Sequence, residues 1–292
     1  MEMTFNVDCL LCHMKKHLSE ACTLGDDQTN MAFARELMEL YSRMPEGACA
    51  PWLAPHTAQL MNRYYGVDLD RYALEKKQSN TFVLERKDQI RQKVASAPDR
   101  VFAALQFAIL GNYIDYSALH GEVSFEKLEE MLVSALDMEL DKECYVNFCA
   151  DLAKGGKLLY ITDNAGEIVF DQILAEEITR QYPQVEITFC LRGGPANNDA
   201  TREDAAAVGI PFPIIDNGNR IAGTQMDQLS EEAETAIKTA DVIIAKGMAN
   251  TETMYCCGYN VYYAFLVKCQ RFVRDFGKPM MTPMLVKEKA PR

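Results

Sequence analysis

A regular alternation of two kinds of segment in the second half of the chain is the feature that most constrains the fold. From about residue 155, short apolar runs bounded by glycine or charged residues alternate with longer amphipathic stretches. The apolar runs predict strands at 157–161, 185–191, 213–215, 241–245 and 261–267. The stretches between them predict helices at 167–182, 201–208 and 230–240. Because strands that alternate with helices form parallel sheets covered on both faces, we expect an α/β fold with a mostly parallel sheet.

The first half of the chain has the spacing of helices instead. Apolar positions predict helices at 12–24, 29–43, 57–65, 69–95 and 101–110, and another that begins after Ser124. A chain of 292 residues is long for one small core. We therefore predict an α-helical domain at 1–150 and an α/β domain at 151–292.

The charge balance limits the kinds of partner. The formal net charge is -12 at pH 7, which argues against a nucleic-acid partner, because binding to a phosphate backbone requires basic patches. It does not exclude a phosphorylated small molecule, since a bound Mg²⁺ reverses the local field. The expected ligand is therefore small.

The chain has the pattern of a cytoplasmic protein. No run approaches the roughly 20 apolar residues needed to cross a bilayer, so we expect no membrane partner. The first residues lack the basic segment and apolar run of a signal peptide. The ten cysteines are accordingly expected to be free thiols in a reducing compartment.

Polar residues follow several of the predicted strands. The first strand is followed by 162–167, the second by 192–199, the fourth by 246–252 and the fifth by Lys268. In an open parallel sheet, ligands bind outside the carboxyl ends of the strands. We therefore expect these segments to converge at one edge of the sheet and to form the functional site.

The residue types at this edge suit a divalent cation and a phosphate. Asp163, Asn164 and Asp199 offer carboxylate and amide oxygens, which are the ligands that Mg²⁺ or Mn²⁺ prefers. Lys246 and Lys268 would balance phosphate charge. Glycines that let backbone amides approach an anion closely are Gly166, Gly193, Gly194 and Gly247.

Simpler interpretations of the same residues stay open. An aspartate between a strand and a helix, such as Asp163, is often only a helix cap, and Asn198-Asp199 would fit a capped turn. Competing chemistry has little support. All four histidines lie in the helical half, so a Ser-His-Asp triad lacks a base near the sheet. Neither a G-x-G-x-x-G after the first strand nor a G-x-x-x-x-G-K-[ST] motif is present.

An ordered set of motifs resembles a known family, the damage-control phosphatases, formerly a domain of unknown function with the number 89. The motifs in the second half are DNAGE at 163–167, NDAT at 198–201 and KGMANTE at 246–252. In the first half, GNYID at 111–115 is similar to another family motif, and DCLLC at 8–12 resembles the stand-alone microbial branch. The resemblance covers nearly the whole chain.

The resemblance implies a Rossmann-like α/β domain beside a helical N-terminal part. It implies a phosphatase that depends on a divalent cation, Mg²⁺ or Mn²⁺ first and Co²⁺ or Ni²⁺ as alternatives, and that acts on phosphorylated metabolites such as sugar phosphates. The family's metal ligands correspond to Asp163, Asn164 and Asp199. Lys268 is the nearest match to a phosphate-binding lysine, although 265–268 reads Phe-Leu-Val-Lys where eukaryotic members have Arg-Thr-x-Lys.

The resemblance also implies contacts to the substrate or its phosphate from further motif positions. Asn112 and Asp115 would reach the cleft from the helical part. Glu167 and Asn250 belong to the motifs at the sheet edge, together with Gly166 and Lys246. A prediction follows that this set surrounds the phosphorylated substrate.

Three alternatives remain open at this point. The nucleophile is either a water on the cation or the Asp163 carboxylate. Cys9 and Cys12 are either half of a soft-metal site, with His13 or His17 nearby, or two reduced thiols on the first helix. The protein itself is a phosphatase, a metabolite-binding protein that uses the same cleft without turnover, or a transferase on a similar sheet. The Arg192-Gly193 end of the second strand argues against a transferase.

Overall fold

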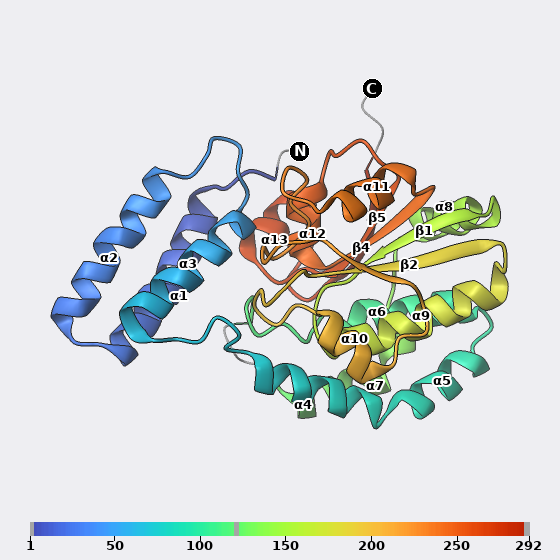
Figure 1. The fold of residues 1–292 in the computed structure, drawn as a ribbon. Coiled ribbons are helices and arrows are strands. Elements are labelled where there is room, and N and C mark those ends of the chain that lie inside the picture. The colour runs from blue at the N-terminus through green and yellow to red at the C-terminus, as the bar shows by residue number, and fades with distance from the viewer. Residues whose placement is uncertain (1–2, 120–122, 289–292) are drawn as a thin grey trace.

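The computed structural model describes residues 3–119 and 123–288, and these residues form one six-stranded sheet covered by helices (Figure 1). The strands run in the order β3-β2-β1-β4-β5-β6, and every neighbouring pair is parallel except β5 and β6. Their bounds are β1 Gly156–Ile161, β2 Val185–Leu191, β3 Ile214–Asp216, β4 Val242–Lys246, β5 Val261–Leu266 and β6 Pro283–Lys287. The predicted α/β fold class is confirmed.

Helices cover both faces of the sheet, and three more helices form a separate layer at its edge (Figure 1). From the N-terminus to β1, the bounds are α1 Val7–Leu24, α2 Asp27–Ser42, η1 Ala50–Trp52, α3 Leu53–Tyr65, α4 Ala73–Leu84, α5 Lys87–Ser96, α6 Arg100–Gly111, α7 Phe125–Val133, η2 Ala135–Asp137 and α8 Lys142–Ala153. After β1 they are α9 Glu167–Gln181, α10 Arg202–Val208, α11 Glu231–Thr239, α12 Gly247–Met254 and α13 Gln270–Phe276.

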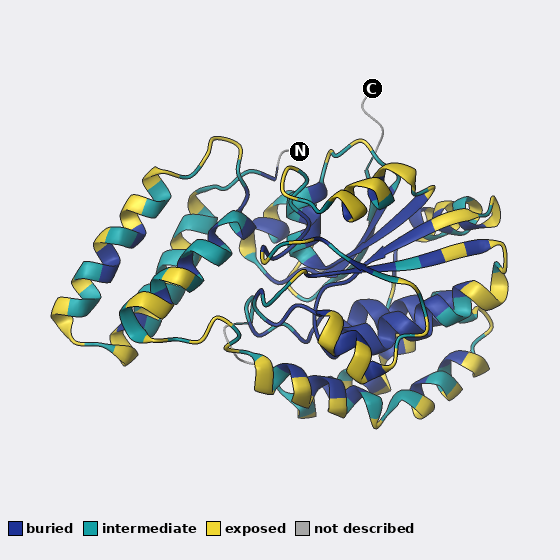
Figure 2. Ribbon diagram, in the orientation of Figure 1, coloured by how far each residue is buried: buried dark blue, intermediate teal, exposed yellow. Residues whose placement is uncertain are grey.

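The alternation of side chains along the buried strands creates two hydrophobic cores, one on each face of the sheet. On β1, Leu158 and Tyr160 point into the larger core, while Leu159 and Ile161 point into the smaller one. Helices α6 and α9 fill the larger core, and α11, α12 and α13 cover the other face (Figures 1 and 2).

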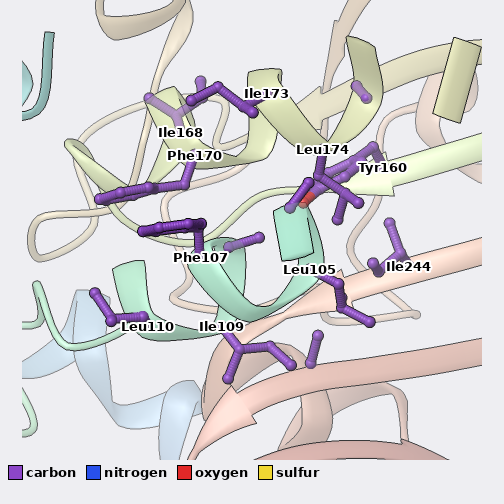
Figure 3. Packing of buried hydrophobic residues seen from close by; sticks show 14 of the residues in the cluster. Leu105, Phe107, Ile109, Leu110, Tyr160, Ile168, Phe170, Ile173, Leu174 and Ile244 are labelled. Carbon is purple, nitrogen blue, oxygen red and sulfur yellow. The ribbon is translucent and has the colours of Figure 1, made fainter. Parts of the chain in front are cut away.

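Helix α6 packs closely on α9, which holds α6 in the larger core on one face of the sheet (Figure 3). The rings of Phe107 and Phe170 are stacked, with centroids 6.4 Å apart and planes at 5°. Gly111 lies directly against the Phe170 ring, since a Cβ at this position would come within 2.6 Å of Cδ2. The end of α6, and with it Asn112, is thereby held close to the start of α9.

Helices α1, α2 and α3 pack around a small cluster of their own, formed by Ala21, Phe33, Leu37 and Met61. This group of helices contacts the α/β part in two places: α1 contacts α13, and η1, which directly precedes α3, contacts α12. Helices α4 to α8, also in the N-terminal half, share the larger core with the sheet. The domain limits 1–150 and 151–292 stay a prediction.

The structure corrects the expected elements in three places. The helix expected at 69–95 is two helices, α4 and α5, with a break at Glu85-Arg86. Arg86 Nη1 donates to Phe82 O at 2.9 Å, which satisfies a carbonyl of the last turn of α4. Helix α12 replaces an expected loop, and α13 and β6 lie in a region for which no element was expected. None of the helices in the described part of the chain is both long and apolar enough to span a bilayer.

Candidate metal and phosphate site

The loops after β1, β2 and β5 open into one cavity of about 710 Å³. Its described lining at the sheet edge includes Asp163, Asn164, Asp199 and Lys268, together with Asp115 from the turn after α6. Residues of α1 and α3 form the opposite wall. The site lies beside β1, where the strand order reverses: β2 and β3 follow on one side of β1, and the chain then crosses to β4 on the other side. It therefore occupies the position at which open α/β sheets bind ligands.

Two amides and a glycine position the carboxylate of Asp163. Its Oδ2 accepts hydrogen bonds from Asn112 Nδ2 at 2.9 Å and from Asn164 Nδ2 at 2.8 Å. Gly247 has a positive φ of 80°, and a Cβ there would lie 1.9 Å from Asp163 Oδ2. The carboxylate therefore occupies space that only a glycine leaves. The N-cap of α9 is Gly166, so Asp163 does not cap this helix.

Asp199 faces Asn164 across a short antiparallel bridge between the loops after β1 and β2. Asp199 Oδ2 accepts from the Nε of Arg192 at 2.5 Å, and both side chains are buried. Asn164 Nδ2 also donates to Glu167 Oε2 at 2.8 Å. The helix that follows, α10, is capped by Thr201, so Asp199 is not its cap.

The three predicted ligands each leave one oxygen free of protein hydrogen bonds. Among the residues that the structure describes, none donates to Oδ1 of Asp163, Asn164 or Asp199. The other polar atom of each side chain is held by the contacts described above. Neighbouring groups therefore orient the ligands, as outer-shell partners do around metal sites.

Electrostatics at this cluster favour a cation. Burial, followed by the charges of Glu167 and Asp199, raises the pKa of Asp163 well above its usual range. Burial raises the pKa of Asp199 to about 6, although the Arg192 guanidinium opposes this shift. A divalent cation would offset the repulsion between these carboxylates, and two carboxylate oxygens with one amide oxygen suit Mg²⁺ or Mn²⁺. The residues present therefore fit the implied metal.

Lys246 lies elsewhere than expected. It is fully buried, and its Nζ donates to Glu167 Oε1 at 2.7 Å, Asp171 Oδ1 at 2.6 Å and Ala108 O at 2.8 Å. Since an ammonium has three protons, none is left for a phosphate. Glu167, also fully buried, accepts from Lys246, Asn112 and Asn164. Both residues thus support the ligands from behind and do not contact a substrate in this arrangement.

Lys268 and Asp115 do reach the cavity, and they are paired. Lys268 Nζ donates to Asp115 Oδ2 at 2.5 Å and to Asn112 O at 2.6 Å, which leaves one proton for a ligand. Asp115 Oδ1 accepts from the amides of Ser117 and Ala118. Burial acts to raise the pKa of Asp115, but Lys268 and the Ala118 amide hold it below its usual range. Asp115 therefore carries a charge beside the predicted cation site.

Asn112 and Asn250 have their side chains committed to protein contacts. Asn112 is fully buried; it donates to Asp163 and accepts from the Leu266 amide at 3.1 Å. Asn250 donates to Thr162 O and Lys246 O. Its Oδ1 accepts from Arg192 at 3.1 Å and from a threonine hydroxyl. These two residues join the loops around the site, and neither is among the described cavity-lining residues.

The glycine amides that were expected to face an anion are also used internally. Gly166 N donates to Asn80 Oδ1 at 2.6 Å, and Gly193 N donates to Asn217 Oδ1 at 2.9 Å. A Cβ on Gly193 would come within 2.6 Å of the Asn219 amide, so this glycine permits close packing of two loops. The structure thus places Gly166 and Gly193 in the framework of the site.

Arg220 is a cavity-lining cation that the expected residues did not include. It lies in the loop after β3, where the sequence reads Asn-Gly-Asn-Arg at 217–220. The sequence could have indicated Arg220, because it follows a predicted strand, as the predicted site residues do. The loops after β1 and β2 contain carboxylates that suit a cation, whereas the β3 loop offers only a cation.

Cys9 and Cys12 lie on α1 and line the same cavity as free thiols. Across 3–119 and 123–288, no group of three or more His, Cys, Asp and Glu side chains is arranged to hold a metal ion. The soft-metal interpretation of this pair gains no support. The cluster of Asp163, Asn164 and Asp199 is of a different kind, because one of its three predicted ligands is an amide.

A second cavity of about 730 Å³ lies between α5 and α6, lined by Gln92, Phe102 and Gln106 among others. Asp99 is the one carboxylate among its described lining residues. Since catalytic sites need several convergent polar groups, we assign the functional site to the cavity at the sheet edge.

Fold and site together define an α/β protein whose mostly parallel sheet presents two carboxylates and an amide to one cavity beside β1. Residues 5–283 match the model of the damage-control phosphatase ARMT1-like domain. The chain belongs to this family.

Relatives extend over almost the full length of the chain. A damage-control phosphatase from Archaeoglobus fulgidus is 31% identical over 281 residues, which are 92% of this chain and 94% of the relative. An uncharacterized protein from Methanocaldococcus jannaschii is 29% identical over 294 residues, 96% of this chain and 94% of the relative. The crystal structure of a DUF89 family protein from Pyrococcus horikoshii matches with a TM-score of 0.82 at 27% identity, covering 98% of this chain and 100% of that one.

Proposed function

We propose that this protein is a phosphatase that depends on a divalent cation and hydrolyses small phosphorylated metabolites, with sugar phosphates and related esters as the first class to test. The observation that carries the proposal is a set of three oriented oxygens on Asp163, Asn164 and Asp199 in one cavity, none of which accepts a hydrogen bond from a described residue. The family match and the damage-control phosphatase from Archaeoglobus fulgidus support the same reaction.

In this proposal, the three oxygens hold Mg²⁺ or Mn²⁺, with Co²⁺ and Ni²⁺ as alternatives. When bound, the cation polarises the phosphate and offsets the charge that develops on the leaving oxygen. Hydrogen bonds from Asn112 to Asp163 and from Asn164 to Glu167 orient the two ligand side chains. Arg192 fixes the orientation of Asp199. The remaining proton of Lys268 is available to a phosphate oxygen.

The wall formed by α1 and α3 covers the part of the substrate beyond the phosphate. Every phosphate ester shares the contacts at the sheet edge, so discrimination must come from this wall and from Asp115. We place the activity in the cytoplasm. The thiols of Cys9, Cys12 and Cys269, which line the cavity, are free, as they would be in a reducing compartment.

A phosphate-release screen tests the proposal. The purified chain is incubated with a panel of phosphorylated metabolites and with Mg²⁺, Mn²⁺, Co²⁺ or Ni²⁺ in turn. We expect release with at least one metal, loss of release after EDTA, and recovery when metal is restored. Tight binding of the same metabolites without any release would identify a non-catalytic binding protein instead.

Rapid quench addresses the nucleophile. If the Asp163 carboxylate attacks phosphorus, an acid quench of the wild type during turnover should yield a phosphorylated aspartate. If water attacks, oxygen from labelled water appears in the released phosphate in a single turnover without such an adduct.

A further inference from the structure

We propose that Arg220 is the principal side chain that binds the substrate's phosphate, and that the loop after β3 is built to present it. The proposal rests on the proposed function, since it names a binding residue for the same cavity. Its support is independent of the ligand cluster and comes from the loop, from the contact with Gly194, and from the charges around the cavity.

The backbone that carries Arg220 is held by two asparagines. Asn217 is fully buried; its Oδ1 accepts from the Gly193 and Asn219 amides at 2.9 and 3.2 Å, and its Nδ2 donates to Gly223 O. Asn219 Oδ1 accepts from the Ile221 amide at 2.9 Å. A loop without regular structure is thereby fixed on both sides of Arg220, so its side chain starts from a defined position.

Gly194 gives the side chain of Arg220 a place to lie. A Cβ on Gly194 would come within 2.8 Å of Arg220 Nε and 3.1 Å of its Cγ. The absence of a side chain at 194 therefore allows the arginine to lie along the loop that follows β2. Asp199 belongs to the same loop as Gly194, and the side chains of Asp199 and Arg220 line the same cavity.

Among the described residues, Arg220 also differs from the other cations of the cavity wall in having no hydrogen-bond or ion-pair partner. The pairs of the others are Lys268 with Asp115, Arg71 with Glu20, Arg271 with Glu252, and Lys16 with Ser117. Within the described ranges, Arg220 makes no hydrogen bond or ion pair, and it is exposed. The acid nearest in sequence, Asp216, accepts from Arg202 Nε at 2.6 Å.

The charges of the groups nearest the predicted metal ligands favour such a cation. Five carboxylates surround the site: the buried Asp163, Glu167, Asp171 and Asp199, and the partly exposed Asp115. Three buried cations oppose them: Arg192, Lys246 and Lys268. A divalent cation would bring the two totals level. A phosphate dianion then adds two negative charges, and the planar fork of an unpaired arginine matches phosphate oxygens in pairs.

The test compares Arg220→Ala and Arg220→Lys with a matched control, Arg35→Ala. Arg35 is also exposed and has no ion pair among the described residues, but it lies on α2 away from the cavity. Inorganic phosphate is titrated calorimetrically into the full-length protein loaded with Mn²⁺, and Mn²⁺ is titrated separately. KM and kcat are measured for the best ester of the metabolite screen.

We expect Arg220→Ala to weaken phosphate binding by about tenfold or more and to raise KM similarly, since hydrogen bonds to a charged group are at stake. Arg220→Lys should recover part of the affinity. Mn²⁺ affinity, and all properties of Arg35→Ala, should stay at wild-type values.

The outcomes separate this proposal from the proposed function. If the wild type releases phosphate from esters but Arg220→Ala keeps its phosphate affinity and KM, Arg220 is a solvated surface residue and the inference is overturned while the phosphatase stands. If no ester is hydrolysed but phosphate binds to the loaded wild type and not to Arg220→Ala, the inference stands and the phosphatase fails. Absence of phosphate binding to the loaded wild type overturns the inference as well.

Discussion

Replacing Lys246 with methionine separates a structural role from a phosphate-binding role. The side chain is fully buried, and its three protons are all donated, two of them to the carboxylates of Glu167 and Asp171. Methionine has a similar length but no charge, so both carboxylates lose their cation. Breaking a buried ion pair from one side costs about 3–5 kcal/mol. For a chain of this size, that loss lowers Tm by roughly 6–10 °C.

The loss of stability should depend on pH in a defined direction. Burial already raises the pKa of Asp171 to about 7, although Lys246 opposes this shift. Without Lys246, the pKa of this carboxyl rises further. A carboxyl whose folded pKa exceeds its unfolded value of about 4 binds more protons when folded, so stability falls as pH rises between the two values. The deficit of Lys246→Met should therefore be larger at pH 8 than at pH 5.

Chemical denaturation and calorimetry at both pH values measure the effect, with EDTA present so that metal binding does not contribute. Lys238→Met is the control: Lys238 forms an exposed i,i+4 pair with Glu234 at 2.6 Å, and exposed pairs of this kind contribute little to stability. If Lys246→Met unfolds like the wild type but binds phosphate more weakly, the lysine faces the ligand and the buried network described above is wrong.

The remaining predictions concern the carboxylate, the glycine behind it and the turn after α6. Asp163→Asn should reduce hydrolysis by at least about 100-fold. Without metal, this variant should be more stable than the wild type at pH 8 and should lose the advantage towards pH 4, because the pKa of Asp163 is raised in the folded protein. Thermal unfolding in EDTA at both pH values measures the difference. Gly247→Ala should abolish Mn²⁺ binding in calorimetry, whereas Gly258→Ala, with a similar positive φ but open space around it, should only cost about 1 kcal/mol of stability. Asn112→Ala should lower the hydrolysis rate of every ester by one common factor of about 10–100. Asp115→Ala should change the ratio of kcat/KM between esters. If both variants lower all rates by one common factor, Asp115 positions the predicted metal ligands and does not select the substrate.

Much of the fold could be predicted because its signals are local. Buried parallel strands are continuous apolar runs, and the predicted 185–191 coincides with β2. Strand β6 was missed because Pro283 and Lys287 weaken its pattern, and an edge strand tolerates both. Its partner β5 supplies the pairing, which no local sequence window contains.

The elements of the site could be predicted, but the division of roles within it could not. Topology places the strand ends together, so the convergence of Asp163, Asn164 and Asp199 in one cavity could be predicted from position and residue type. Whether a polar residue faces the cavity or supports it from behind depends on side-chain direction across several elements. Lys246 is the last residue of β4 and Lys268 follows β5, yet one is surrounded by acceptors and the other reaches the cavity.

The central claim is that Asp163, Asn164 and Asp199 bind one divalent cation. Calorimetric titration of Mn²⁺ into the metal-free wild type, Asp163→Asn and Asp199→Asn tests this most directly, since it needs no substrate. We predict one site per chain in the wild type and an affinity at least about tenfold lower in each variant. Equal affinity in all three proteins, or no binding to the wild type, would contradict the claim.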